Sequence, residues 1–227
     1  MNDFDFKAII DAAPYLFLSG LKFTLLLTLT SAVGGVILGT LLATARLYGR
    51  RWIAWPAAIY VNLFRSLPLV LVIFLLYFIL PYALQWVMQS DRPITLGATG
   101  SAFVTFILFE AAYFSEIIRA GVKSVGHGQY AAGCALGLTH SQAVRKVILP
   151  QALRNMLPVL LTQMIIIFQE TALVYVLSLT DFLGAATKIA QRDNRLVEMY
   201  VLVAIVFFII SFSASQGVRL LRARLGA

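Results

Sequence analysis

Long apolar stretches dominate the chain, and short charged or polar segments separate them. About 20 apolar residues suffice to cross a membrane, since a helix rises ~1.5 Å per residue and the hydrocarbon core is ~30 Å thick. No stretch shows the alternation of apolar and polar positions that is typical of a membrane β-barrel. The pattern therefore predicts an all-α membrane protein with five transmembrane helices, at about residues 20–46, 54–86, 94–122, 154–179 and 198–218.

The composition agrees with this interpretation. Of the 227 residues, 60% are hydrophobic and 12% are charged. Soluble domains contain about 45–50% apolar residues and about 25% charged residues. These values exclude a disordered protein, a nucleic-acid-binding domain and a secreted disulfide scaffold, and the single cysteine, Cys134, excludes an intrachain disulfide. The net charge of +8 is better explained by membrane orientation and contact with anionic membrane lipids than by nucleic acid as a partner.

The basic residues are unevenly divided between the two sides of the predicted bundle. Loops rich in Lys and Arg face the cytoplasm, so we expect the N-terminus outside and the C-terminus inside. The expected organisation is an N-terminal periplasmic segment at 1–18, a transmembrane domain at 19–218 and a basic cytoplasmic tail at 219–227. One set of flanks contains basic residues and no acidic ones: Arg46, Arg50, Arg51, Lys123, Arg145, Lys146, Arg154, Arg219, Arg222 and Arg224.

The inner segment at 123–153 is predicted to be structured. It begins with a short Ala-rich helix, and Gly137 can adopt the positive φ that ends such a helix. Thr139 and Gln142 have the spacing of a capping box, which starts a second short helix that Pro150 stops or redirects. The segment is either a connector packed on its own bundle or a docking element, and its small side chains favour docking.

This segment resembles the EAA loop of ABC importer permeases, with a Gly and a Leu-Pro pair at the family's spacing. Ala131 replaces the family's Glu, Gly133 replaces its second Ala and Val147 replaces its Ile. The resemblance implies a coupling helix that inserts into a cleft of a cytoplasmic ATPase. The coupling residues that it implies are Ala131, Ala132, Gly133, Gly137, Leu138, Leu149 and Pro150.

Three further segments, at 64–70, 110–121 and 168–179, resemble the polar amino-acid branch of that family. The last of them, followed by Asp181 and Phe182, is most similar to the glutamate/aspartate import permeases. The resemblance covers nearly the whole chain and implies the type-1 ABC importer permease fold. It also implies import of glutamate or aspartate across a bacterial inner membrane, with glutamine, histidine or arginine as alternative substrates.

The resemblance implies partners as well. The chain has no Gly-x-x-x-x-Gly-Lys-Ser/Thr loop for nucleotide phosphates, so ATP would be used by a separate cytoplasmic ABC ATPase dimer. A second permease subunit, either an identical copy or a related chain, and a periplasmic amino-acid-binding protein would complete the transporter. We expect this chain to be no enzyme and to bind no cofactor, metal or nucleic acid.

Ionisable residues inside the predicted spans are candidate functional residues, because a charge in hydrocarbon is costly. Glu170 lies between the polar residues Gln169 and Thr171 in the fourth stretch. Its carboxylate either holds the ammonium group of an amino acid or pairs with a basic residue of another helix or subunit. These three residues and Arg65 are the predicted substrate-path residues.

The depth of Arg65 depends on where the second span begins. If the helix begins near Trp52, Arg65 lies near the middle of the membrane and can meet a carboxylate; if it begins at Ser66, Arg65 is a cytoplasmic flank. In the third span, Glu110, Glu116 and Arg119 are interpreted as mostly structural, with Glu116 and Arg119 paired on one helix face. 

Two other classes of protein fit less well. An intramembrane enzyme needs a nucleophile with its base, or a metal cluster, at membrane depth, and none of the predicted spans contains His or Asp. An ion channel needs no docking element on its cytoplasmic side, so the structured inner segment argues against it.

Overall fold

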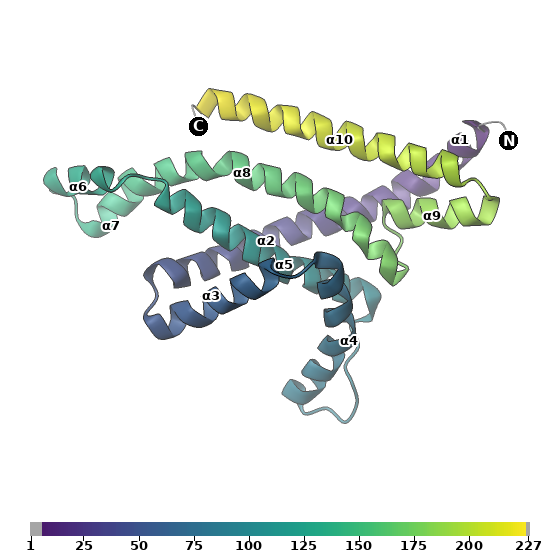
Figure 1. Cartoon of the computed structure of the whole chain (residues 1–227), viewed down its shortest axis with the longest axis horizontal. Helices are drawn as coiled ribbons and strands as arrows, with labels where there is room; N and C mark the ends of the chain where they lie inside the picture. Colours follow the sequence, from purple (N-terminus) through teal and green to yellow (C-terminus); the bar gives the residue numbers. More distant parts are fainter. Residues whose placement is uncertain (1–5, 226–227) are drawn as a thin grey trace.

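The computed structural model describes residues 6–225, and every regular element in that range is a helix (Figure 1). Five helices in this part of the chain are long and apolar enough to cross a membrane, which confirms the all-α, five-span prediction. They are Phe6–Tyr48, Leu69–Met88, Gly97–Lys123, His140–Leu177 and Leu196–Leu225. The elements in order are α1 (Phe6–Tyr15), η1 (Leu16–Leu21), α2 (Lys22–Tyr48), α3 (Arg51–Arg65), α4 (Leu69–Met88), α5 (Gly97–Lys123), α6 (His127–Ala135), α7 (His140–Ala143), η2 (Val144–Ile148), α8 (Leu149–Glu170), η3 (Thr171–Leu177), α9 (Phe182–Asp193) and α10 (Leu196–Leu225).

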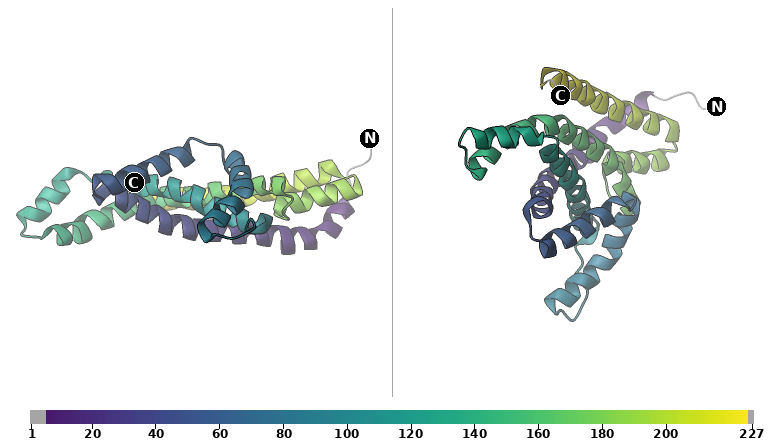
Figure 2. Two further views of the ribbon diagram at one scale, coloured as in Figure 1. Left: turned by 90° about the horizontal axis from the view of Figure 1, so that it is seen from below. Right: turned by 60° about the vertical axis from the view of Figure 1, so that its left-hand side comes forward.

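The bundle is elongated, and different elements occupy its two ends (Figures 1 and 2). The hairpin of α6 and α7 projects beyond the bundle at one end. The start of α1 and the helix α9 lie at the opposite end. The C-terminal half of α10 runs toward the hairpin end, so the two ends of the described chain lie toward opposite ends of the long axis.

The first spanning helix is longer than the predicted range of 20–46. The elements α1, η1 and α2 form one helix of 43 residues, which includes residues 6–18 of the expected N-terminal segment; residues 1–5 lie outside the described part. The π-helical turn η1 presents Gly20 to α9. A Cβ on Gly20 would lie 2.9 Å from the Cβ of Ala185, so this glycine lets the two helices touch.

The range 54–86, expected as one span, is divided between α3 and α4. Pro68 has no N–H to donate and disfavours helical backbone at the residue before it. Accordingly α3 ends at Arg65, Ser66 caps it, and α4 begins directly after Pro68. Of the two helices, α4 has the length and hydropathy of a membrane span, and α3 packs as a separate helix against α2 and α5.

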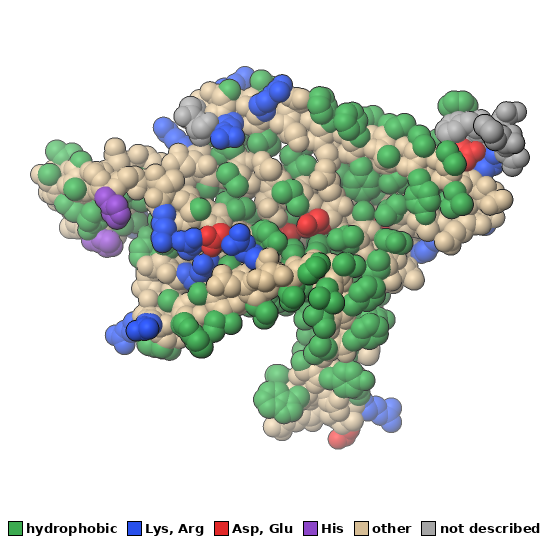
Figure 3. Space-filling view, viewed as in Figure 1, with side chains coloured by type: hydrophobic (Ala, Val, Ile, Leu, Met, Phe, Trp, Pro, Cys, Tyr) green, Lys and Arg blue, Asp and Glu red, His purple; other side chains and the backbone are tan. Residues whose placement is uncertain are grey.

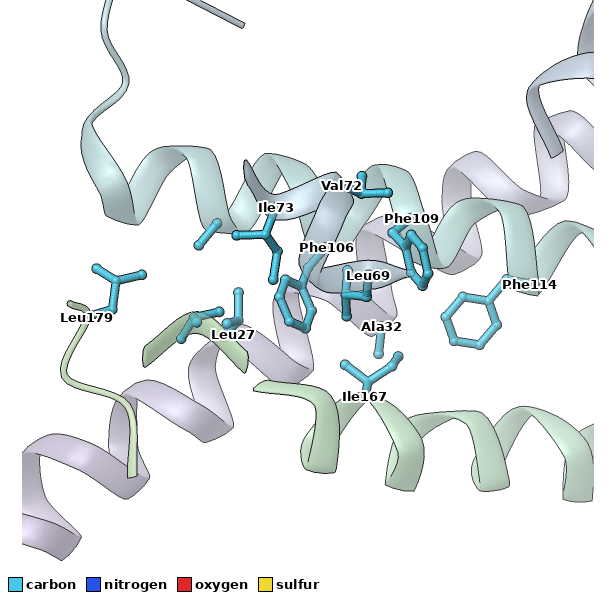
Figure 4. Close-up of a cluster of buried hydrophobic side chains, with 12 residues drawn as sticks. Leu27, Ala32, Leu69, Val72, Ile73, Phe106, Phe109, Phe114, Ile167 and Leu179 are labelled. Carbon is cyan, nitrogen blue, oxygen red and sulfur yellow. The ribbon is translucent and has the colours of Figure 1, made fainter. Parts of the chain in front are cut away.

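Close packing of α2 on α5 organises the bundle, and this helix pair makes the most extensive contact within the described residues. A Cβ on Gly39 would lie 2.9 Å from the backbone nitrogen of Ser115 and 3.0 Å from the carbonyl oxygen of Ala111. Small residues at such crossings let membrane helices approach closely. Next to the crossing lies an apolar core from α2, α4, α5, α8 and the chain after η3 (Figure 4), with Leu27, Ala32, Leu69, Val72, Ile73, Phe106, Phe109, Phe114, Ile167 and Leu179 among its members.

We expect Gly39→Leu to lower the thermal unfolding midpoint of the purified protein in detergent. The new side chain collides with backbone atoms of α5, and overpacking of this kind costs about 1–3 kcal/mol. The matched control is Gly217→Leu in α10, because a Cβ on Gly217 meets nothing within 4 Å. Equal midpoints for the two variants would contradict the close α2–α5 contact.

The helix α9 was not among the predicted elements. Its twelve residues are too few for a membrane span, and the charged residues in and around it are typical of a loop between spans. Asp181 caps its start, where the carboxylate accepts hydrogen bonds from the backbone N–H groups of Leu183 at 3.0 Å and Gly184 at 3.1 Å. Buried side chains of α9 pack against α1, η1 and α10 in a second apolar cluster, separate from the core of Figure 4.

Candidate functional site

A group of charged side chains joins α2, α3 and α5 around Glu116. The Nη1 atom of Arg46 donates to Oε2 of Glu116 at 2.9 Å, and the guanidinium of Arg119 donates to both carboxylate oxygens. Arg65 contributes a third guanidinium, with its Nη1 4.0 Å from Oε2 of Glu116. The predicted pairing of Glu116 with Arg119 is therefore present, and three guanidinium groups around one carboxylate leave a surplus of positive charge.

Figure 3 shows Lys and Arg side chains around an acidic side chain in the middle of the visible face, with further acidic side chains beside them. Arg65 reaches this group from the end of α3. Neither of the two starts expected for the second span describes the structure: α3 is a separate helix that begins at Arg51, and the candidate span begins at Leu69. Arg65, at the end of α3, nevertheless lies beside the carboxylate of Glu116. The same guanidinium lies over the ring of Tyr113, 5.6 Å from its centroid, a cation–π arrangement.

The predicted trio of Gln169, Glu170 and Thr171 lies where α8 changes into the 3₁₀ helix η3. The hydroxyl of Thr171 is buried and donates to the carbonyl oxygen of Phe168 at 2.7 Å. This hydroxyl is therefore occupied by a backbone hydrogen bond at the end of α8. Gln169 is exposed, and Glu170 is partly buried. The three neighbours in sequence therefore point in different directions, because successive helical residues are about 100° apart.

Glu110, which the sequence interpretation gave a mostly structural role, lies next to the predicted path residue Glu170. It is completely buried in α5, and its carboxyl group meets that of Glu170 from α8. Its Oε2 atom accepts a hydrogen bond of 2.9 Å from Nε2 of Gln163. Tyr113 follows Glu110 by three residues, so both side chains lie on one face of α5. This spacing connects Glu110 with Tyr113 but does not indicate Glu170.

The arrangement offers complementary groups for a zwitterion. The carboxyl groups of Glu110 and Glu170 can hold an ammonium group, and Arg65 can hold a carboxylate by charge-assisted hydrogen bonds. Tyr113 carries the guanidinium of Arg65 over its ring and interacts electrostatically with Glu110 and Glu170 as well. Within residues 6–225, no group of three or more His, Cys, Asp or Glu side chains is placed to hold a metal ion.

The predicted coupling segment forms a helical hairpin in the structure. Gly137 follows α6 with a φ of +78°, as expected for the residue that ends this helix. The N–H of Gly137 donates to the carbonyl of Cys134 at 3.0 Å, and the N–H of Leu138 donates to that of Gly133 at 3.1 Å. This pattern is a Schellman motif, which satisfies the last carbonyl groups of the helix.

The second arm of the hairpin starts with the predicted capping box. The side chain of Thr139 accepts from the N–H of Gln142 at 3.4 Å, and the Gln142 side chain accepts from the N–H of Thr139 at 2.9 Å. Pro150 does not stop this arm, contrary to the expectation. The π-helical η2 carries the chain directly into α8, and Pro150 lies just after the junction, in the first turn of α8.

The residues predicted to couple to an ATPase divide between the inside and the outside of the hairpin. Gly133 is buried, and a Cβ there would lie 3.4 Å from the Cβ of Ala143, so it allows the two arms to pack. Ala131 and Ala132 are exposed on α6, and Leu138 is half-buried. Leu149 and Pro150 are exposed at the base of the hairpin, and Leu136 is 83% exposed at its tip. The exposed side chains named here on the outer face of the hairpin are thus apolar, and those on α6 are small.

Comparison with known proteins gives consistent results. Residues 35–227 match the family described as "Binding-protein-dependent transport system inner membrane component". The glutamate/aspartate import permease protein GltK of Escherichia coli O6:H1 is 49% identical over 224 residues, which cover 99% of both chains. The arginine transport system permease protein ArtQ of Bacillus subtilis is 33% identical and covers 91% of this chain and 90% of its own length.

Solved structures share the fold. The crystal structure of an amino acid ABC transporter with histidines superposes with a TM-score of 0.86 at 31% identity, covering 97% of this chain and 98% of the other. An inward-facing structure of the MetNI methionine ABC transporter gives a TM-score of 0.69 at 22% identity, covering 91% of this chain and 96% of the other. The second likeness concerns the fold alone.

Proposed function

This chain belongs to the binding-protein-dependent transport system inner membrane component family, and on that premise we propose that it is the permease subunit that conducts glutamate and aspartate through a bacterial ABC importer. The observation that supports glutamate and aspartate as the substrates is the 49% identity to a glutamate/aspartate import permease over 99% of both chains. The surplus of guanidinium groups around Glu116 supports it, since an acidic amino acid carries two carboxylates.

The proposed substrate path runs past Arg65 and Glu170. Glu170 binds the ammonium group of the amino acid, and Arg65 attracts a carboxylate. Gln169, the residue before Glu170, is exposed and offers an amide, which both donates and accepts hydrogen bonds. Thr171 acts by holding the end of α8 through its bond to Phe168, which fixes the position of Glu170 next to it.

The proposed energy source is a cytoplasmic ATPase dimer that binds the α6–α7 hairpin. Two permease chains, either two copies or this chain with a related one, face each other across the path, and a binding protein delivers substrate on the outer side. The exposed small residues Ala131 and Ala132 allow close approach of the ATPase surface, and exposed Leu136 supplies apolar contact. ATP binding then moves the hairpins of the two permease chains together and changes which side the path opens to.

We propose that the hairpin end is cytoplasmic and that α9 lies on the outer side. The test uses a membrane-impermeant thiol reagent on intact cells. The native Cys134 on the hairpin is exposed in this chain and should be labelled only after lysis in denaturant. A cysteine introduced at the exposed Gln191 of α9, in a Cys134→Ala background, should be labelled in intact cells. The reverse labelling pattern would show that the orientation is inverted.

Uptake measurements test the substrate. A strain that lacks this permease should regain uptake of labelled L-glutamate when the chain is expressed with its partners. Unlabelled L-aspartate should compete strongly, while glutamine, histidine and arginine in the same excess should not. Strong competition by one of these three amino acids, with none by L-aspartate, would assign the chain to another substrate within the same family.

A further inference from the structure

The facing carboxyl groups of Glu110 and Glu170 have an unusual environment. Glu110 has no exposed surface, and its Oε1 atom has no hydrogen-bond donor, as is also the case for Oε2 of Glu170. Gln163 satisfies only the other oxygen of Glu110. A buried carboxylate oxygen without a donor is costly, and here two such oxygens belong to groups that meet each other.

No basic side chain of the described residues forms an ion pair with either carboxyl group. From α3, Arg65 reaches the neighbouring Tyr113 and Glu116 instead. From α2, the residue against Glu110 is Gly35, where a Cβ would lie 3.0 Å from the Cβ of Glu110. From α8, the neutral Gln163 is the partner of Glu110. Tyr113 on α5 is the other titratable group that faces the pair.

Two carboxylates cannot both stay charged when they meet away from water, because their repulsion adds to the loss of hydration. One proton between them removes the repulsion, and the resulting carboxyl group supplies the donor that the two orphan oxygens lack. A primary ammonium group serves the same purpose, since it carries one positive charge and three donors. A proton and an ammonium group therefore compete for the same position between the carboxyl groups of Glu110 and Glu170.

We propose that Glu110 and Glu170 share one proton when the path is empty and that the ammonium group of the substrate displaces this proton to the solvent. The inference rests on the proposed function, and it adds Glu110 as the second half of the ammonium site. Gln163 is a positioning residue, because its amide holds Glu110 with the free Oε1 available. The exchange is balanced: one ammonium group enters, and one proton leaves.

The experiment measures proton release on binding. The assembled transporter in lipid nanodiscs is titrated with L-glutamate by calorimetry in two buffers of different ionisation enthalpy, near pH 7. Wild-type protein should release close to one proton per L-glutamate bound. Its affinity should rise about tenfold per pH unit over the range in which the pair is protonated, as linkage requires when one proton is released.

Two variants identify the groups responsible. Glu110→Gln and Glu170→Gln each leave a single carboxylate, so both should bind L-glutamate at least about tenfold more weakly and without proton release. The matched control is Glu198→Gln on α10, a carboxylate that pairs with Arg195, which should leave proton release unchanged. Proton release that persists in both site variants would overturn the inference.

The wild-type measurement stands even if a variant fails to fold. L-Glutamate binding without proton release at any pH between 6 and 8 would overturn the shared proton and leave the proposed function intact. Absence of both binding and uptake of L-glutamate would instead overturn the proposed function, and this inference with it.

Discussion

Replacement of Gly137 by valine should abolish ATP hydrolysis coupled to transport while the protein remains in the membrane. Gly137 has a φ of +78°, and a β-branched residue resists this region of backbone conformation at a cost of about 1–3 kcal/mol. Relief of this strain would break the two hydrogen bonds that end α6. Because α6 and its apolar outer face are the proposed contact with the ATPase, a change in their direction should uncouple the two subunits.

The matched variant is Gly137→Asn, since asparagine tolerates a positive φ. A Cβ at this position meets nothing within 4 Å, so the two substitutions differ in backbone preference rather than in steric fit. The measurement is ATPase activity in proteoliposomes with and without the binding protein and substrate. Stimulation at the wild-type level in Gly137→Val would contradict the proposed role of this helix end.

A second large effect is expected from Glu170→Gln, which keeps the shape of the side chain and removes its charge. Loss of one partner of a desolvated charge pair costs about 2–5 kcal/mol, which corresponds to roughly thirty-fold to several thousand-fold in affinity. Transport should therefore fail at low substrate concentration and recover partly at high concentration.

The measurement is uptake against substrate concentration, normalised to the amount of permease in the membrane. A purely structural Glu170 gives a different result: the amount of folded permease falls, the apparent affinity stays normal, and extra substrate does not help. Glu198→Gln provides the comparison, because it changes a carboxylate of α10 outside the proposed path. Normal apparent affinity in Glu170→Gln would remove this residue from the substrate path.

The features that depend on short-range sequence rules could be predicted. The hairpin is an example: a glycine with positive φ after α6, followed by the capping box of Thr139 and Gln142, is determined by residues within a few positions of each other. The five spans follow from the length of the apolar stretches. The break between α3 and α4 was more difficult, because many apolar residues precede Pro68 as well as follow it, so the second apolar stretch has no clear start in the sequence.

The candidate site depends on packing between distant segments, which periodicity does not reveal. Glu110 and Glu170 are brought together by the contact of α5 with α8, and nothing near Glu110 in the sequence indicates its partner. Arg65 similarly reaches Glu116 only because α3 folds back against α5. The helix α9 was missed for another reason: its apolar face is short, and it becomes apparent only when η1 and α10 cover it.

The uninterrupted helix from Phe6 to Tyr48 has a mechanical consequence. Its 43 residues, at ~1.5 Å each, give a rod of about 65 Å, roughly twice the thickness of a hydrocarbon core. Near one end Arg46 is tied to Glu116, and in between Gly39 rests on the backbone of α5. With this contact as the pivot, a small rotation of the short arm toward Tyr48 moves the long arm toward Phe6, which carries Gly20 against α9, through a wider arc.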